Sequence, residues 1–248
     1  MSKKSKAAHT SANQVEMAWE RFYKKDFDGA LELFDAAREG HNDPSANFGR
    51  ACALFRISDH EGALAELGGL IRADSKNAAA YHTRAMIYGA DEHYEKALKD
   101  LQKVTSLQPD NMEAWCDLGG VYLTLSKYAE AAECFERSAG SGMGCSCAWL
   151  GKALVALYQK QYKKSVEYLN IAIKQDASQP LAHMARAEVY FLTGRAKEGA
   201  KDMGRALLLD KDFFEKFKLS MDEDVSDEQS DDSDEDTTLS DDSFLRDD

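Results

Sequence analysis

Cysteine is the residue type in this chain whose placement comes nearest to a metal site. Cys145 and Cys147 are separated by one residue and follow a glycine-rich stretch, and Cys116 and Cys134 precede them at irregular spacing. A structural zinc site needs four ligands, commonly as two closely spaced pairs. The six histidines show no metal-ligand spacing. We therefore predict no metal site and no other cofactor.

The sequence also lacks the patterns expected of an enzyme. The glycines between residues 140 and 144 are not followed by the Lys-Ser/Thr pair that a phosphate-binding loop requires. No Ser/His/Asp set and no carboxylate pair stands out from a surface that is rich in charge. We therefore predict a non-catalytic protein.

The net charge of -13 is confined to the C-terminal end of the chain. Residues 222–248 hold 14 of the 44 acidic residues and one of the 31 basic residues, so the other residues carry 30 of each sign. High charge with few apolar residues is typical of disorder, and we predict a disordered acidic tail over residues 221–248. A solubilising role, attraction of a basic partner and autoinhibition all remain open for this tail.

The acidic tail and the residue just before it also contain candidate phosphorylation sites. Ser220, Ser233 and Thr238 each have an acidic residue three positions later, the pattern that acidophilic kinases accept. Phosphorylation there would deepen the negative charge.

Features that the sequence lacks indicate the cellular compartment and the classes of partner. There is no signal peptide and no apolar run of about 18 residues, and the five cysteines are an odd number. We expect a soluble cytoplasmic protein, or part of a cytosol-facing assembly, without a disulfide framework. Residues 1–10 are predicted to be a disordered basic N-terminus. We expect neither a nucleic-acid nor a membrane partner.

A pattern of about 34 residues recurs along the chain and predicts the architecture. A small residue recurs at gaps of 33, 34, 34, 34 and 34 residues, and a bulky apolar residue follows each one four positions later. The small residues are Ala30, Ala63, Ala97, Ala131, Ser165 and Gly199, and the bulky ones are Phe34, Leu67, Leu101, Phe135, Leu169 and Met203. Such a period is typical of a solenoid, in which each unit buries its core against its neighbours.

Each unit has the pattern of two helices joined by a short turn. When the units are numbered from residues 11, 44, 78, 112, 146 and 180, positions four, eight and eleven share one helical face, and position eight is always Ala or Gly. A polar break and a second amphipathic stretch follow. We predict six units, over residues 11–43, 44–77, 78–111, 112–145, 146–179 and 180–212.

The residues at these positions resemble the tetratricopeptide repeat family. The clearest unit is the fourth, with Trp115, Leu118, Gly119, Tyr122, Tyr128, Ala131 and Phe135. The resemblance covers residues 11–212 and implies an all-α fold, a right-handed α-solenoid of six helix–turn–helix repeats. An apolar run mixed with lysines then predicts a cap helix over residues 213–220.

Charged residues at position seven of three units are matched by acids 16 residues later. The pairs are Arg50 with Glu66, Arg84 with Asp100, and Arg186 with Asp202. In units one and four both positions are non-charged, so the charges come and go together, with Lys152 and Tyr168 of unit five as an imperfect case. We predict three partly buried ion pairs within the repeats. Binding of an acidic ligand by the arginines is the alternative.

In this family, positions two, five, nine and twelve of the first helix line the concave face, and we name these positions the groove stripe. The predicted groove residues on it are Val15, Trp19, Phe22, Phe48, Phe55, His82, Met86, Leu123, Leu150, Leu154, Leu157, Leu181, Met184 and Phe191. The lysines, asparagines and arginine that grip a terminal carboxylate in chaperone-binding members are absent from positions five and nine. We therefore do not expect a carboxylate clamp for heat-shock chaperone tails.

An apolar groove suits the amphipathic helix or extended segment of a protein partner. Alternatively, tight winding of the solenoid or a second copy of the chain covers the stripe. We predict a scaffold or adaptor that binds such a segment. A chaperone for an aggregation-prone client and a fixed structural subunit of a large assembly are the alternatives.

Overall fold

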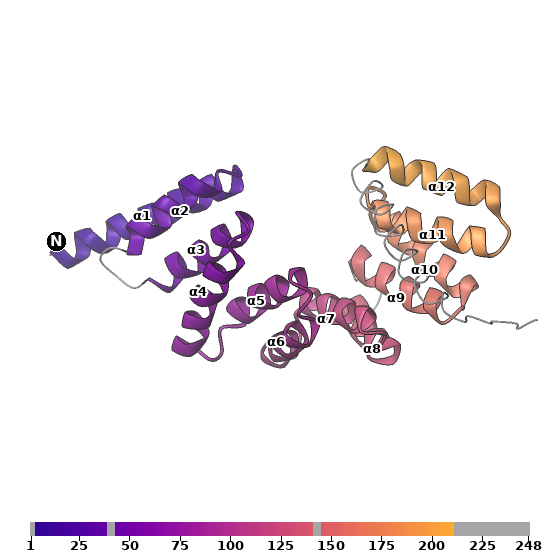
Figure 1. The fold of residues 1–248 in the computed structure, drawn as a ribbon, viewed down its shortest axis with the longest axis horizontal. Helices are drawn as coiled ribbons and strands as arrows, with labels where there is room; N and C mark the ends of the chain where they lie inside the picture. The colour runs from indigo at the N-terminus through magenta and orange to yellow at the C-terminus, as the bar shows by residue number, and fades with distance from the viewer. Residues whose placement is uncertain (1–2, 39–42, 141–144, 211–248) are drawn as a thin grey trace, which may run out of the picture. The chain divides into compact units, whose positions relative to one another are not determined.

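The computed structural model describes residues 3–38, 43–140 and 145–210, without the side chains of residues 3–10. These ranges form twelve α-helices and no strand (Figure 1). The helices are α1 Lys3–Tyr23, α2 Phe27–Arg38, α3 Pro44–Arg56, α4 His60–Ala73, α5 Ala78–Ala90, α6 Tyr94–Leu107, α7 Met112–Thr124, α8 Tyr128–Ala139, α9 Ser146–Tyr158, α10 Tyr162–Gln175, α11 Pro180–Leu192 and α12 Ala196–Leu209. The expected all-α helical-repeat fold is confirmed.

The helices are arranged as consecutive pairs. From α1 to α10, each helix packs against the next one along the chain, so each of the first four pairs stacks on the pair that follows. A second compact unit begins at Ser178, and in it α11 packs against α12. The first helices from α3 onward begin at residues 44, 78, 112, 146 and 180, the same residues from which the sequence pattern numbers each unit.

The N-terminal helix is longer than the sequence pattern predicted. We expected a disordered segment over residues 1–10, but α1 begins at Lys3. Lysine and alanine, which are good helix formers, dominate this stretch, and no glycine or proline interrupts it before residue 23. The first helix therefore extends beyond the face that packs against α2.

Small residues at two positions let the helices of each pair approach closely. Position eight is buried in all six pairs, and so is the small residue at position twenty. A bulky side chain then fills the space between them, as Phe34 does at 0% exposure. Full burial of such a side chain contributes about 1.5–3 kcal/mol.

In every helix pair, the turn residue at position fifteen has a left-handed backbone conformation. These residues, with φ between 55° and 75°, are Lys25, Ser58, Glu92, Ser126, Lys160 and Gly194. The next amide donates back to a carbonyl five residues earlier, as Lys127 N does to Tyr122 O at 2.8 Å. Five of the six are not glycine, so five turns accept the cost of a left-handed side chain, roughly 1–2 kcal/mol each.

The arginines at position seven lie against their matched acids. Arg84 donates from Nε to Asp100 Oδ2 at 2.7 Å and from Nη2 to Oδ1 at 2.8 Å. Arg186 binds Asp202 in the same bidentate way, at 2.6 and 2.8 Å. The hydrogen bond to Asp100 raises the pKa of the Arg84 guanidinium above its usual range. Each pair therefore joins the two helices of its repeat.

In the second repeat, the arginine also binds an acid of the first repeat. Arg50 Nη1 donates to Glu66 at 2.9 Å, and its Nε donates to Asp35 on α2 at 2.7 Å. Arg38, also on α2, reaches the same Glu66 carboxylate at 3.1 Å. The expected pair is thus part of a four-residue network that joins two neighbouring repeats.

Several predicted features lie outside the described residues. They are the cap helix at 213–220, the acidic tail at 221–248, and the candidate phosphorylation sites Ser220, Ser233 and Thr238. None of the described helices combines the length and the apolar character needed to cross a membrane.

Candidate functional site

The N-terminal part of the groove stripe is filled by aromatic side chains that pack on one another. The Trp19 ring centroid lies 5.3 Å from that of Phe22 and 5.3 Å from that of Phe34. Val15, Trp19 and Phe22 pack on the buried cluster of the first repeat, and Phe48 and Phe55 pack on that of the second. These predicted groove residues are half-buried, and much of their surface serves the core.

Later parts of the stripe divide between buried and exposed side chains. On α9, Leu150 and Leu157 are buried, and Leu154 between them is half-buried. On α11, Met184 is buried, whereas the predicted groove residues on either side of it are exposed. Those exposed residues are Leu181 and Phe191. The stripe is therefore not one uniform apolar surface.

A hollow of about 340 Å³ opens in the middle of the stripe, between α5, α6 and α7. Its wall is mainly apolar and includes Met86, a predicted groove residue whose side chain is 53% exposed. The lining residues are Ala85, Met86, Gly89, Tyr94, Leu101, Cys116, Asp117, Gly120, Val121 and Thr124. Leu123 is half-buried one residue before the last of these and does not line the hollow. Ligand sites are typically concave and mostly apolar, with a few placed polar groups.

This hollow exists because two residues of its wall are glycines. Gly89 and Gly120 occupy positions twelve and nine of the groove stripe, and a Cβ atom added at either would meet nothing within 4 Å. The neighbouring Gly119 differs, because a Cβ there would come 2.8 Å from the Phe135 ring. The helix is thus close-packed on one face and open on the other.

A histidine–carboxylate pair lies beside the hollow. His82 Nε2 is 2.6 Å from Asp117 Oδ2, and this pair joins α5 to α7. The hydrogen bond to Asp117 raises the pKa of His82 against the opposing effect of burial, and the charge of Glu113 adds to the rise. Asp117 also lines the hollow, so a carboxylate stands in a mainly apolar wall.

A second hollow, of about 420 Å³, lies at α6, α7 and α8 and is a poorer candidate. Its wall carries several charged or polar groups, including Glu130, Glu133 and Gln102. The Arg137 guanidinium lies 4.7 Å from the Trp115 ring centroid, and the Trp115 indole donates to the Pro109 carbonyl at 2.8 Å. Several polar groups at this surface therefore already have partners within the protein.

The unpaired thiols are poorly suited to nucleophilic chemistry. Burial raises the pKa of Cys52 and Cys134 to about 11, and burial raises that of Cys116 to about 12. Since the thiolate is the nucleophile, these groups are weak nucleophiles at neutral pH.

The remaining two cysteines form a disulfide, Cys145–Cys147, whereas we expected no disulfide framework. The bond encloses a single residue, Ser146, and does not connect separate elements. The expectation rested on the odd number of cysteines and on the lack of a signal peptide, and these features do not exclude a bond within one turn. Cys116, which had seemed irregularly spaced, lies next to this pair.

Sequence reasoning missed part of the wall of the central hollow. Gly89 and Gly120 fell on the groove stripe but were not chosen, because the selection looked for large apolar side chains. The useful signal was the opposite one, a glycine at a groove position with no packing partner. Asp117 and Tyr94 lie off the stripe, and only the packing of α6 against α7 could have identified them.

Comparison with known proteins agrees with the fold. The sequence model of the tetratricopeptide repeat matches residues 15–78, 82–144 and 150–212. Among curated proteins, the chain is similar to anaphase-promoting complex subunit 3 of Schizosaccharomyces pombe, with 28% identity over 134 residues. That match covers 54% of this chain but 20% of the other protein, so the chain spans about a fifth of that relative's length.

Solved structures are similar at low sequence identity and support the fold alone. A tetratricopeptide repeat protein from Parabacteroides merdae has a TM-score of 0.69 at 21% identity, covering 82% of this chain and 80% of its own. PilF of Pseudomonas aeruginosa has a TM-score of 0.71 at 16% identity, covering 86% of this chain and 99% of its own.

Proposed function

The chain belongs to the tetratricopeptide repeat family, and we propose that it is a non-catalytic scaffold that binds an apolar anchor of a protein partner in the hollow between α5, α6 and α7. Repeats of this family generally serve as protein-interaction scaffolds. The observation that carries the proposal is the pair of unpacked glycines, Gly89 and Gly120, on the groove stripe. They leave space in an apolar wall at the position where the family binds its ligands.

The wall of the hollow indicates what the partner offers. Met86 is flexible and exposed, and methionine adapts to anchors of different shape. Large aliphatic or aromatic side chains would bury the most apolar surface there. Asp117 supplies an acceptor at the edge, suited to a backbone N–H or a hydroxyl of the same segment. We therefore expect an amphipathic helix or extended segment with one large apolar anchor.

The remaining features of the partner follow from the charges on the stripe. The imidazole of His82 is already engaged by Asp117, so it is a poor receptor for a terminal carboxylate. This supports our expectation that heat-shock chaperone tails are not ligands.

The acidic tail remains a candidate site for a basic partner, and a cytoplasmic location remains part of the proposal.

Peptide selection tests this function. A display library of random segments would be panned against the full chain, with a photo-crosslinking residue in place of Met86 to report proximity. We expect enriched segments to share a large apolar residue and to crosslink at position 86.

Two variants make the selection interpretable. Gly120→Leu places a side chain in the hollow, and Gly204→Leu adds the same side chain on α12, where a Cβ also meets nothing within 4 Å. Loss of enrichment in the first variant and its retention in the second would support the proposal. Equal enrichment by both variants, or crosslinks that avoid position 86, would refute it.

A further inference from the structure

Three cysteine sulfurs gather where the fourth and fifth helix pairs stack. The Sγ atoms of Cys116, Cys145 and Cys147 all lie within 4.8 Å of one another. Cys116 belongs to α7, and the other two stand at the start of α9, which packs against α7. The fold, rather than the local sequence, therefore sets the spacing of these sulfurs.

The repeat register explains how distant residues meet. Cys116 is at position five of its unit, and Cys147 is at position two of the next unit. Both positions belong to the groove stripe, and stacked first helices place them on facing surfaces. Two cysteines about one repeat apart in sequence thus become neighbours in space.

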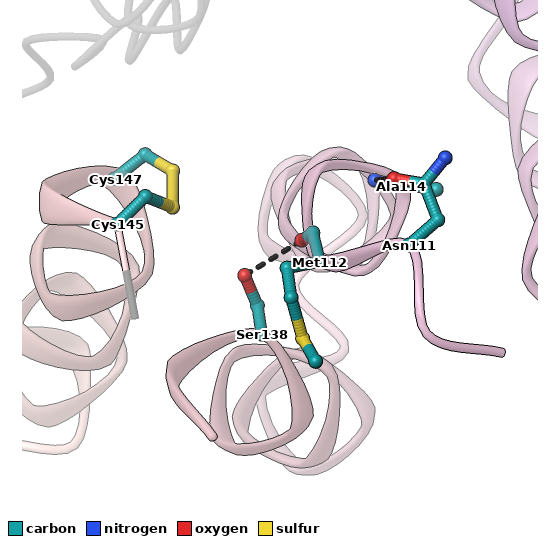
Figure 2. The surroundings of a disulfide bond; sticks show 6 residues. All are labelled: Asn111, Met112, Ala114, Ser138, Cys145 and Cys147. Atoms are coloured by element: carbon teal, nitrogen blue, oxygen red, sulfur yellow. Dashed lines mark hydrogen bonds between the residues drawn. A yellow bond between two sulfur atoms is a disulfide. The ribbon is translucent and has the colours of Figure 1, made fainter. Parts of the chain in front are cut away.

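Two hydrogen bonds hold the start of α7, the helix that carries Cys116. The Ser138 hydroxyl donates to the Met112 carbonyl at 2.7 Å, which ties the end of α8 to the first turn of α7 (Figure 2). Asn111 caps the same helix by accepting from the amide of its third residue at 3.0 Å. Cys116 follows Met112 by one helical turn, so its backbone is held in place.

The sulfurs can act together only when the disulfide is reduced. A dithiol reductant supplies two electrons, which break the Cys145–Cys147 bond, and each released sulfur takes up one proton to become a thiol. The two thiols of the reductant become a disulfide in the same exchange. The cluster then holds three thiols.

We propose that Cys116, Cys145 and Cys147, in this reduced form, bind one Cu(I) ion through three sulfurs. Sulfur ligands select Cu(I), zinc and iron–sulfur clusters among biological metals. Metal–sulfur bonds of about 2.3 Å in a three-coordinate plane separate the sulfurs by about 4 Å. Cys116 already lies within this range of the pair, and Cys145 and Cys147 must move apart once their bond is broken. Binding releases the three thiol protons to solvent and leaves three thiolates on the ion.

The number of ligands favours Cu(I) over Zn(II). Structural zinc is almost always four-coordinate, whereas Cu(I) is stable with three sulfur ligands. In the described part of the chain, the cluster contains these three cysteines and no histidine, aspartate or glutamate. Under reducing conditions, Cys145 and Cys147 would therefore leave the disulfide and join Cys116 as ligands of the copper ion.

Anaerobic titration of the reduced full chain with Cu(I), in competition with a chromophoric Cu(I) chelator, tests the site. We expect one tightly bound ion per chain, and X-ray absorption should report sulfur-only coordination by three ligands. Cys116→Ser should weaken Cu(I) binding by more than the roughly 10–100-fold that changes outside the ligand shell cause. Circular dichroism of each variant reports whether it folds.

The chain offers matched controls in its two other free cysteines. Cys52→Ser and Cys134→Ser also remove one thiol, but from outside the cluster, and should leave the Cu(I) affinity unchanged. Equal losses from Cys52→Ser and Cys116→Ser would overturn the proposal. So would a failure of the reduced chain to compete with the chelator, or tighter binding of Zn(II) than of Cu(I).

Discussion

Two adjacent glycines on α7 have opposite roles. Gly119 faces the second helix of its repeat, where the Phe135 ring occupies the space that a side chain would need. Gly120 faces the hollow, where a Cβ meets nothing within 4 Å. One glycine allows close packing and the other leaves the hollow open. The two faces should therefore respond differently to mutation, the first in stability and the second in binding.

The same contrast separates the N-terminal repeats from the middle of the array. Position nine of the stripe is Trp19 in the first repeat, where its ring packs against Phe22 and Phe34. It is Gly120 in the fourth, where the surface is open. Family membership thus does not make every repeat a binding site, because large stripe residues can be used by the core.

The largest expected effect lies on the packed face, at the Arg84–Asp100 pair. Asp100 is 6% exposed, so Asp100→Ala leaves a partly buried arginine without its partner. Breaking a buried pair in this way costs about 3–5 kcal/mol. Urea denaturation should report this loss in the free energy of unfolding.

The fourth repeat supplies the matched control for that variant. It carries Leu118 and Cys134 where the third repeat has Arg84 and Asp100. The double variant Arg84→Leu/Asp100→Cys should therefore recover most of the lost stability, since both charges are gone. A double variant no more stable than Asp100→Ala would contradict the account of the packed face.

The two α7 glycines provide the next comparison. Gly119→Ala should destabilise the fold by about 1–3 kcal/mol, because its methyl group must displace the Phe135 ring. Gly120→Ala should instead stabilise it by about 0.5–1 kcal/mol, because alanine is the better helix former. Urea midpoints with unchanged slopes would measure both. The same sign for the two variants would argue against different faces.

A smaller effect is expected at the turns, which belong to neither face. Glu92 adopts φ 59°, a left-handed conformation that glycine accepts without strain. Glu92→Gly should stabilise the protein by about 0.5–1 kcal/mol, after the greater freedom of glycine in the unfolded chain is subtracted. Thermal unfolding measures the gain, and Gly194→Ala at the equivalent turn should show the reverse.

The smallest effect is pH dependence beside the hollow. The pKa of His82 is raised in the folded protein by its hydrogen bond to Asp117, so the charged pair stabilises the fold fully below the unfolded pKa. That contribution disappears as pH rises through the folded pKa. His82→Gln should abolish this part of the pH dependence of the melting temperature. The exposed His93→Gln serves as control, and an equal change in both would contradict the prediction.

Periodicity made most of the fold predictable, because packing constrains the residues that repeat. Position eight must be small in every unit, and the Arg–acid spacing must match across two helices of fixed geometry. The hollow depends instead on glycines, which have no side chain. The predicted groove residues were mainly large ones such as Met86, so the glycines were not among them. The cysteine cluster depends on stacking between units, which spacing within one unit does not reveal. The left-handed turns were hidden because five of the six are not glycine.

The affinity of Gly120→Leu for an anchor peptide selected on the unaltered chain tests the central claim most directly. Calorimetric titration would compare this variant with the unaltered chain and with Gly204→Leu. We predict that Gly120→Leu binds at least about tenfold more weakly, a loss of about 1.4 kcal/mol. Its melting temperature should not fall, and Gly204→Leu should bind like the unaltered chain. Unchanged affinity in a folded Gly120→Leu variant would contradict the proposed site.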